Sequence, residues 1–281
     1  MDISPAQGPD SCVLALHCSL GSGRQWARLA EALDGRYQVV APDLAGYRQP
    51  INPATTLARE VDCLSETIAA TRGPIHLIGH SYGGAVAFKI ATTPAFASRL
   101  RSLTLIEPVL PTLLRDNDAD RRLHDRFRGL AIDLCIDFWN GNVMEAVDKF
   151  VCFWNGSEPV ERPSPEARLR MIAQAEQLTF HFRAILAEDN VVPAAATIRV
   201  PTLLMSGGLS PYVGQRTVQR LAGLIAGSDA RHFRDAGHMM PLTHRHLVNA
   251  EIIKHIAHAD GLAAGVPVAA SPLRPASTAT A

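Results

Sequence analysis

The chain has 281 residues, 47% of them hydrophobic, which is enough apolar side chain to bury a large core. Lys plus Arg and Asp plus Glu number 27 each, so the formal net charge is zero and neither nucleic acid nor an anionic membrane is an expected partner. The five cysteines are scattered without C-x-x-C spacing, which favours free thiols over disulfides or a zinc site.

The chain shows no targeting or membrane signal. Its N-terminus lacks a basic stretch followed by an apolar segment, and no apolar run approaches the roughly 20 residues that a membrane helix needs. We therefore expect a cytoplasmic protein that acts on a small molecule. The sequence does not indicate an oligomeric state.

The first half of the chain alternates segments typical of strands with segments typical of helices. Short apolar runs predict strands at 12–17, 37–41, 75–78 and 103–106. Apolar residues three or four apart and turn residues between the runs predict helices at 24–33, 56–71 and 84–91. Strands that alternate with helices indicate an α/β fold, in which a parallel sheet is covered by helices on both faces.

The alternation stops between residue 108 and about residue 197. This block predicts helices at 121–137, 144–152 and 165–186, after which the alternation returns as strand 201–205, helix 213–225, strand 230–234 and helix 246–258. A helical block between two parallel strands suggests an inserted cap over the carboxyl edge of the sheet, where ligands bind in open α/β sheets.

These patterns divide the chain into four parts. Residues 11–108 and 198–258 are predicted to form the α/β core, and residues 109–197 the helical cap. We expect residues 1–10 to be flexible. Residues 259–281 are rich in Ala, Pro, Ser and Thr, a composition typical of a disordered tail.

The segment Gly79-His80-Ser81-Tyr82-Gly83 carries the strongest functional signal. It fits Gly-x-Ser-x-Gly and joins a predicted strand to a predicted helix, which is the context in which a serine is exposed on a sharp turn as a nucleophile. The alternative is a structural turn, since the residue types are common. The flanking strand and helix favour the nucleophile.

With three further landmarks, the chain resembles the α/β-hydrolase family over about residues 10 to 258. The landmarks are His17-Cys18-Ser19-Leu20-Gly21, Ala41-Pro42-Asp43-Leu44-Ala45-Gly46, and Ala236-Gly237-His238 before the last helix. An elbow serine followed late in the chain by a histidine is the order of that family. The resemblance implies a mostly parallel central sheet with helices on both faces and an inserted helical cap.

The resemblance also implies roles for individual residues. His238 stands in the loop where the family places the base that takes the proton of the serine. The oxyanion hole would use the backbone N–H groups of Tyr82 and Ser19. The chain has Cys18 where the family usually has glycine. Cys18 is interpreted as a small buried residue, with a reactive thiol as the alternative.

The catalytic acid departs from the family pattern. After the strand at 201–205 the family carries an aspartate, but this chain has Ser210 near that position, and a serine cannot compensate an imidazolium charge. Glu107, at the end of the preceding core strand, is the favoured acid, with a structural carboxylate as the alternative. Asp229 and Asp235 are further candidates, although Asp235 is only three residues from His238.

The predicted function is a cofactor-free serine hydrolase that cleaves a carboxylic ester or related acyl compound through an acyl-enzyme. No cofactor motif or metal-ligand cluster is recognisable. Tyr47 and the aromatic residues of the cap, among them Trp139 and Trp154, are candidate substrate contacts. Packing is the alternative, which the abundance of aromatic residues in protein cores favours. A cofactor-free oxygenase or lyase, or a non-catalytic ligand-binding protein, remain alternatives. Ser81 excludes dehalogenases and epoxide hydrolases of this fold, which need a carboxylate at the elbow.

Overall fold

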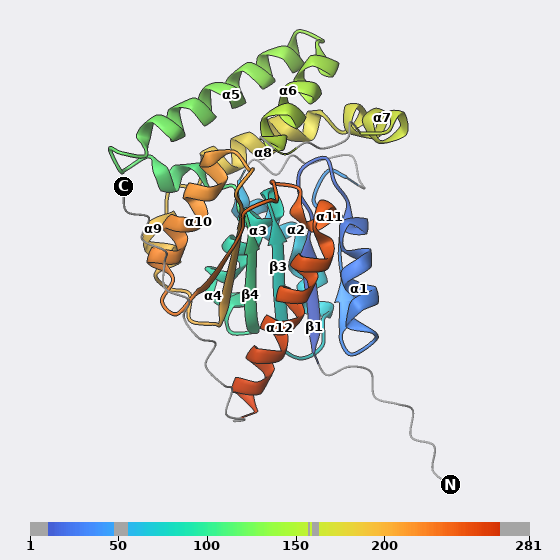
Figure 1. The fold of residues 1–281 in the computed structure, drawn as a ribbon, viewed down its shortest axis with the longest axis vertical. Coiled ribbons are helices and arrows are strands. Elements are labelled where there is room, and N and C mark those ends of the chain that lie inside the picture. Colours follow the sequence, from blue (N-terminus) through green and yellow to red (C-terminus); the bar gives the residue numbers. More distant parts are fainter. Residues whose placement is uncertain (1–10, 48–55, 157, 159–162, 265–281) are drawn as a thin grey trace.

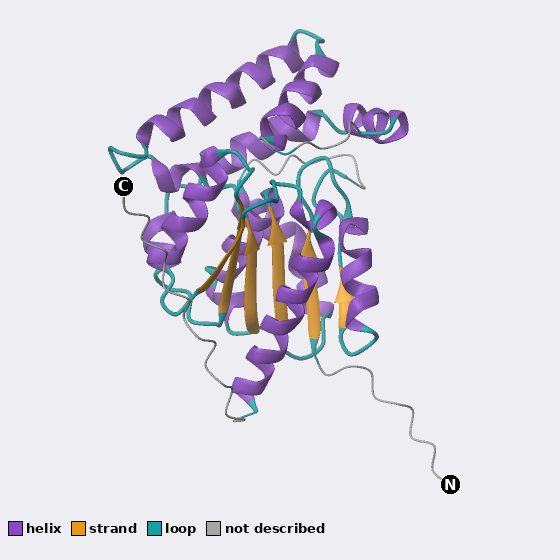
Figure 2. Cartoon of the chain, in the orientation of Figure 1, coloured by secondary structure: helices purple, strands orange, loops and turns teal. Residues whose placement is uncertain are grey.

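The computed structural model describes residues 11–47, 56–156, 158 and 163–264. Its centre is a sheet of six parallel strands in the order β2-β1-β3-β4-β5-β6 (Figures 1 and 2). The strands are β1 (Cys12–Leu16), β2 (Gln38–Val40), β3 (Ile75–His80), β4 (Leu100–Ile106), β5 (Thr202–Gly207) and β6 (Asp229–Phe233). The predicted α/β class and parallel sheet are thereby confirmed.

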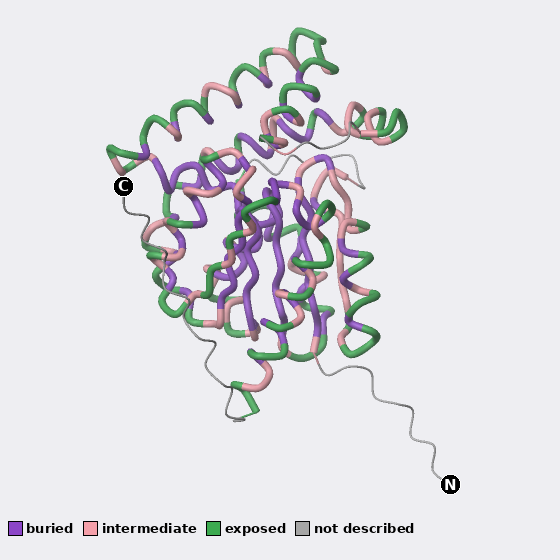
Figure 3. The backbone as a smooth tube through the Cα atoms, viewed as in Figure 1, coloured by how far each residue is buried: buried purple, intermediate pink, exposed green. Residues whose placement is uncertain are grey.

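Helices cover both faces of the sheet, so the central strands are buried along their length (Figure 3). Side chains of a strand alternate between faces, and β1 follows this rule. Val13 and Ala15 pack in a cluster with α1 (Ala27–Leu33) and α12 (Arg245–Ala263). Leu14 and Leu16 pack in the cluster that contains side chains of α2, α3 and α10. These helices are α2 (Leu57–Ala70), α3 (Tyr82–Ala91) and α10 (Tyr212–Leu224).

The chain between β4 and β5 forms a helical block, and its helices α5 to α8 lie across the carboxyl end of the sheet (Figure 1). The block contains α5 (Arg121–Trp139), α6 (Val143–Asn155), α7 (Pro165–Ala173), α8 (Glu176–Leu186) and α9 (Val191–Ala195). We call this block the cap. Carboxyl ends of parallel strands and the loops that follow them therefore face the underside of the cap, which is where the candidate site lies.

One predicted helix of the cap is wrong. The segment 165–186 is two helices, because the chain turns at Gln174 and Ala175 between them. The turn lets α8 bury Leu178, Phe182 and Ile185, whereas no residue of α7 is buried. Burial of these three apolar side chains contributes more free energy than the few backbone hydrogen bonds that a continuous helix would add.

Other boundaries also differ from the prediction. The last helix extends to Ala263 rather than 258, and Ala259 is buried, so the tail does not begin at residue 259. The helix predicted at 24–33 begins with the 3-10 turn η1 (Gly23–Trp26) and continues as α1. The short helices α4 (Pro94–Ala97), η2 (Pro111–Leu114) and α11 (Met240–Thr243) were not predicted, because four residues show no periodicity. The predicted flexible residues 1–10 and the tail residues 265–281 lie outside the described residues. None of the described helices is long and apolar enough to cross a membrane.

Candidate active site

Ser81 occupies the sharp turn between β3, which ends at His80, and α3, which begins at Tyr82. Its backbone has φ 59° and ψ −120°, a conformation that costs a non-glycine residue about 1–3 kcal/mol. The turn is tight on both sides. A Cβ on Gly79 would lie 2.3 Å from the carbonyl oxygen of Gly83, and one on Gly83 would lie 2.4 Å from that of His17. Glycine is therefore required at both positions.

Ser81, His238 and Glu107 form a continuous chain of hydrogen bonds beneath the cap. The His238 Nε2 atom lies 2.9 Å from the Ser81 hydroxyl, and Nδ1 lies 2.6 Å from the Glu107 carboxylate. All three side chains are buried. An ionised carboxylate only accepts hydrogen bonds, so Nδ1 carries the proton. This tautomer leaves the lone pair of Nε2 facing the serine hydroxyl, as a general base requires.

The end of β4 and the last residue of β5 hold Glu107 in place. Glu107 follows Ile106 directly and has φ 41°, a second strained residue at the same edge of the sheet. Its other carboxylate oxygen accepts a hydrogen bond of 2.8 Å from the N–H of Gly207. The hydroxyl of Ser210, near the usual acid position, is buried and has no hydrogen-bond partner among the described residues.

A second chain of hydrogen bonds links the histidine loop to the loop after β1. The N–H of Cys18 donates to the Gln25 amide oxygen at 3.2 Å, and the Gln25 amide nitrogen lies 3.0 Å from His80 Nδ1. His80 Nε2 lies 2.9 Å from the carbonyl oxygen of His238. Burial, together with the nearby His238, lowers the pKa of His80 well below 6.5. A neutral His80 that accepts at Nδ1 and donates at Nε2 satisfies every contact in this chain.

Two residues of the cap stack on residues next to Ser81: Trp154 on His238 and His181 on Tyr82. The ring of Trp154 stacks on His238 with the ring centroids 4.0 Å apart. The ring of His181 stacks on Tyr82 with the centroids 3.6 Å apart, and His181 Nδ1 lies 2.8 Å from the Ser19 hydroxyl. Trp154 was among the aromatic residues predicted for the cap. No sequence pattern distinguished Gln25 or His181, because a contact made across more than fifty residues leaves no local signal.

Ser19 and Tyr82 are the two residues whose backbone N–H groups are expected to form the oxyanion hole. Tyr82 is the first residue of α3, where an N–H has no acceptor within its own helix. Ser19 lies in the loop after β1, and both residues line a small cavity together with Ser81. Leu20 has φ 57°, and its N–H donates to the Tyr47 hydroxyl at 2.7 Å.

Cys18 is buried, and burial raises the pKa of its thiol to about 12. A thiol of this kind stays protonated near neutral pH and is a poor nucleophile. The structure therefore favours a packing role over the alternative of a reactive thiol. All five cysteines are unpaired.

Tyr47 and Trp139, two of the candidate substrate contacts, differ in their positions. The Tyr47 hydroxyl is engaged by Leu20, and its ring lies 5.0 Å from that of His17, so Tyr47 supports the loop that carries Ser19. Trp139, at the end of α5, is 74% exposed and lines none of the cavities described below. The structure thus does not bring Trp139 to the site, and the cap aromatic that lies against the catalytic groups is Trp154.

Glu60 is a buried carboxyl group next to Tyr82. It accepts hydrogen bonds from the N–H of Ala45 at 2.7 Å and from the Tyr82 hydroxyl at 3.1 Å. Burial is the main cause that raises the pKa of Glu60 from 4.5 to about 7. Because the folded protein holds this proton more tightly than the unfolded chain, the contribution of Glu60 to stability falls as pH rises from about 4.5 to about 7.

Replacing Glu60 with glutamine should remove this pH dependence. The glutamine oxygen can accept from the Ala45 N–H, and its amide nitrogen can donate to the Tyr82 hydroxyl oxygen in place of the hydrogen bond that Tyr82 donates to Glu60. We expect the variant to gain about 2–3 kcal/mol over the parent between pH 5 and pH 8, measured as the difference in urea unfolding free energy. Glu66→Gln, on the same helix, is the control and should show no such gain. A constant difference at both pH values would contradict the assignment.

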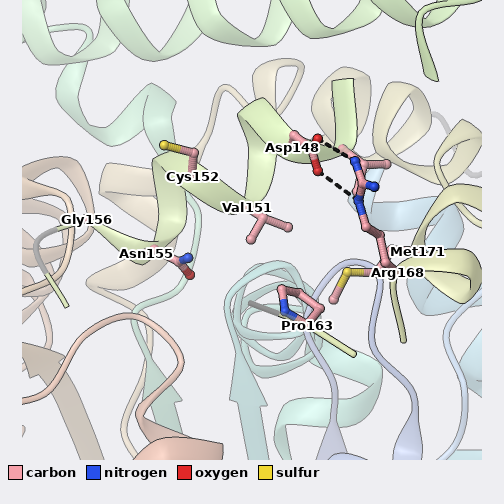
Figure 4. A pocket seen from close by; sticks show the side chains of 9 residues that line it. Asp148, Val151, Cys152, Asn155, Gly156, Pro163, Arg168 and Met171 are labelled. Carbon is pink, nitrogen blue, oxygen red and sulfur yellow. Dashed lines mark hydrogen bonds and ion pairs between the residues drawn. The ribbon is translucent and has the colours of Figure 1, made fainter. Parts of the chain in front are cut away.

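One cavity adjoins Ser81, and a second lies next to the first. The smaller, of about 10 Å³, lies against Ser81 and is otherwise lined mainly by apolar cap and core residues. The larger, of about 500 Å³, lies between the loop after β1, α6 and α7 and shares Ser19, Phe150 and Trp154 with the smaller one. A cavity of about 550 Å³ lies within the cap between α6 and α7, beside the ion pair of Asp148 and Arg168 (Figure 4). It contains none of the catalytic groups.

Comparison with known proteins identifies a family. A model of the alpha/beta hydrolase family matches residues 13–251. A lipase of Mycobacterium tuberculosis, LipV, is 35% identical over 100 residues, which are 35% of this chain and 37% of that protein. The chain thus spans about a third of the length of the first curated relatives it matches. The 2-hydroxy-6-oxononadienedioate/2-hydroxy-6-oxononatrienedioate hydrolase of Escherichia coli is 24% identical over 271 residues, covering 89% of this chain and 88% of that protein.

Solved structures share the fold at low sequence identity. An esterase from Exiguobacterium antarcticum has a TM-score of 0.71 at 19% identity and covers 89% of this chain and 93% of its own. MenH from S. aureus has a TM-score of 0.70 at 19% identity and covers 91% of this chain and 96% of its own.

Proposed function

This chain belongs to the alpha/beta hydrolase family, and we propose that it is a cofactor-free serine hydrolase that cleaves a carboxylic ester or a related acyl compound through an acyl-enzyme. The observation that carries the proposal is the buried chain of hydrogen bonds from Glu107 through His238 to Ser81. Esterase and lipase relatives support the substrate class.

The geometry supports a two-step reaction. The Ser81 hydroxyl attacks the substrate carbonyl as its proton passes to His238 Nε2, and Glu107 stabilises the imidazolium that forms. The N–H groups of Ser19 and Tyr82 would donate hydrogen bonds to the carbonyl oxygen as it becomes negatively charged. His238 then gives the proton to the leaving alcohol, which leaves the acyl group on Ser81. A water molecule, deprotonated by His238, releases the acid and restores the hydroxyl.

A second candidate is hydrolysis of a carbon–carbon bond beside a ketone. It is favoured by the match to the E. coli hydrolase, which extends over most of both chains. Both reactions use water and end in a carboxylic acid, so the same site serves either. Comparing the turnover of simple esters with that of a 2-hydroxy-6-oxo dienoic acid distinguishes them.

A fluorophosphonate probe tests the proposed nucleophile directly. The probe reacts with serine hydroxyls that a base activates, so we expect one probe per chain, located on the peptide that contains Ser81 by mass spectrometry. Urea-unfolded protein is the control and should remain unlabelled, since it has no His238 beside the serine. Labelling of another residue, or no labelling of the folded protein, would refute the acyl-enzyme mechanism.

A further inference from the structure

His181 of helix α8 is a buried polar residue that lies against the reacting groups without a role in the proposed mechanism. It is 3% exposed and lines the small cavity beside Ser81. Most other cap residues around this cavity are apolar: Phe127, Phe150, Leu178, Phe182 and Ile185. A histidine among them requires an explanation, because burying a polar group without partners costs about 1–3 kcal/mol.

Three neighbours hold the His181 ring in one orientation. Its Nδ1 lies 2.8 Å from the Ser19 hydroxyl, one face stacks on Tyr82 at 3.6 Å, and the Tyr47 ring lies 5.8 Å away. The remaining polar atom, Nε2, is buried and has no hydrogen-bond partner among the described residues. Burial lowers the pKa of His181 well below 6.5, so the ring is neutral near neutral pH. Burying a charged carboxylate among these mainly apolar side chains costs far more than burying an uncharged oxygen, so an uncharged partner fits Nε2 better.

We propose that His181 Nε2 is a hydrogen-bonding subsite for an uncharged ketone or hydroxyl group of the substrate. This inference rests on the proposed hydrolase function and adds a substrate class to it. The cavity beside Ser81 has a volume of about 10 Å³, near the lower limit for one water molecule, so it has room for little more than the oxygen atom itself. The rest of the substrate would lie in the neighbouring cavity of about 500 Å³, which shares Ser19, Phe150 and Trp154 with the smaller one.

The test measures oxygen preference, defined as kcat/KM for an oxygenated ester divided by kcat/KM for its plain parent. One series compares methyl butanoate, pentanoate and hexanoate with their 3-, 4- and 5-oxo derivatives and with methyl 3-hydroxybutanoate. The other compares propyl acetate with 2-oxopropyl and 2-hydroxypropyl acetate. The hydroxyl compounds serve either tautomer of His181, since a hydroxyl both donates and accepts. Comparing the same ratio between variants cancels the intrinsic reactivity of each ester.

We expect His181→Phe to lower the oxygen preference at least about tenfold for one or more of these pairs, the effect of leaving a buried polar group unpaired. Phenylalanine keeps the stacking on Tyr82 but offers no ring nitrogen. His124→Phe is the matched control, because His124 is a buried histidine of α5 that lines neither this cavity nor the larger one beside it. It should leave the ratio unchanged. If His181→Phe does not fold, the smaller His181→Leu replaces it.

The same preference is measurable as binding, which separates this inference from the proposed function. Titration calorimetry with the Ser81→Ala protein, which needs no turnover, should show tighter binding of the preferred oxygenated ester, and Ser81→Ala/His181→Phe should lose the difference. An equal ratio in the parent and in His181→Phe, or an equal loss in His124→Phe, would overturn the subsite. Lack of turnover with intact binding preference would count against the hydrolase function alone.

Discussion

Replacing Ser81 with alanine is expected to lower kcat for ester hydrolysis by on the order of 10⁴ to 10⁶, because loss of the nucleophile removes the acyl-enzyme route. The measurement is steady-state release of p-nitrophenol from p-nitrophenyl butanoate. Ser65→Ala is the control, since Ser65 lies on α2 and donates only to the Asp62 carbonyl. It should stay within about twofold of the parent.

Ser81→Gly separates catalysis from folding. Ser81 has φ 59°, a conformation that glycine adopts without the strain of a side chain. Both substitutions should abolish turnover, but the glycine variant should melt at a temperature at least as high as the alanine variant. Residual kcat above about a tenth of the parent in either variant would be incompatible with Ser81 as the nucleophile.

Replacing Glu107 with glutamine is expected to lower kcat by on the order of 10⁴, the cost measured for the corresponding change in a serine protease. The amide oxygen can still accept from the Gly207 N–H, so the amide nitrogen faces His238 Nδ1. That nitrogen is a donor, which forces the imidazole proton onto Nε2. The Nε2 atom then cannot accept the proton of Ser81.

Ser210→Ala is the matched control for the acid. The Ser210 hydroxyl is buried and has no partner among the described residues, so its removal should change kcat by less than about threefold. Circular dichroism should be unchanged in both variants. A larger loss in Ser210→Ala than in Glu107→Gln would show that the acid is assigned to the wrong loop.

The sequence by itself determined the fold class and the elbow. Short apolar runs and apolar residues three or four apart reflect the burial that each segment needs wherever it packs, so the parallel sheet and most helices were predictable. The Ser81 turn was also predictable. Its tight contacts require glycine at Gly79 and Gly83, and both lie within two residues of Ser81, so the requirement is visible as a local sequence motif. The turn at Gln174 was not, since burial of one face of α8 decides it.

Only the tertiary structure decided which distant side chains meet. Glu107, Asp229 and Asp235 were all candidate acids from the chain, but the backbone directs the Glu107 carboxylate to His238 across 131 residues. Trp139 and Trp154 were equivalent cap aromatics in the sequence, yet one is exposed and the other stacks on His238. His181 carried no signal at all. Contacts between remote segments depend on how helices cross the sheet edge, and no local pattern of residues records that geometry.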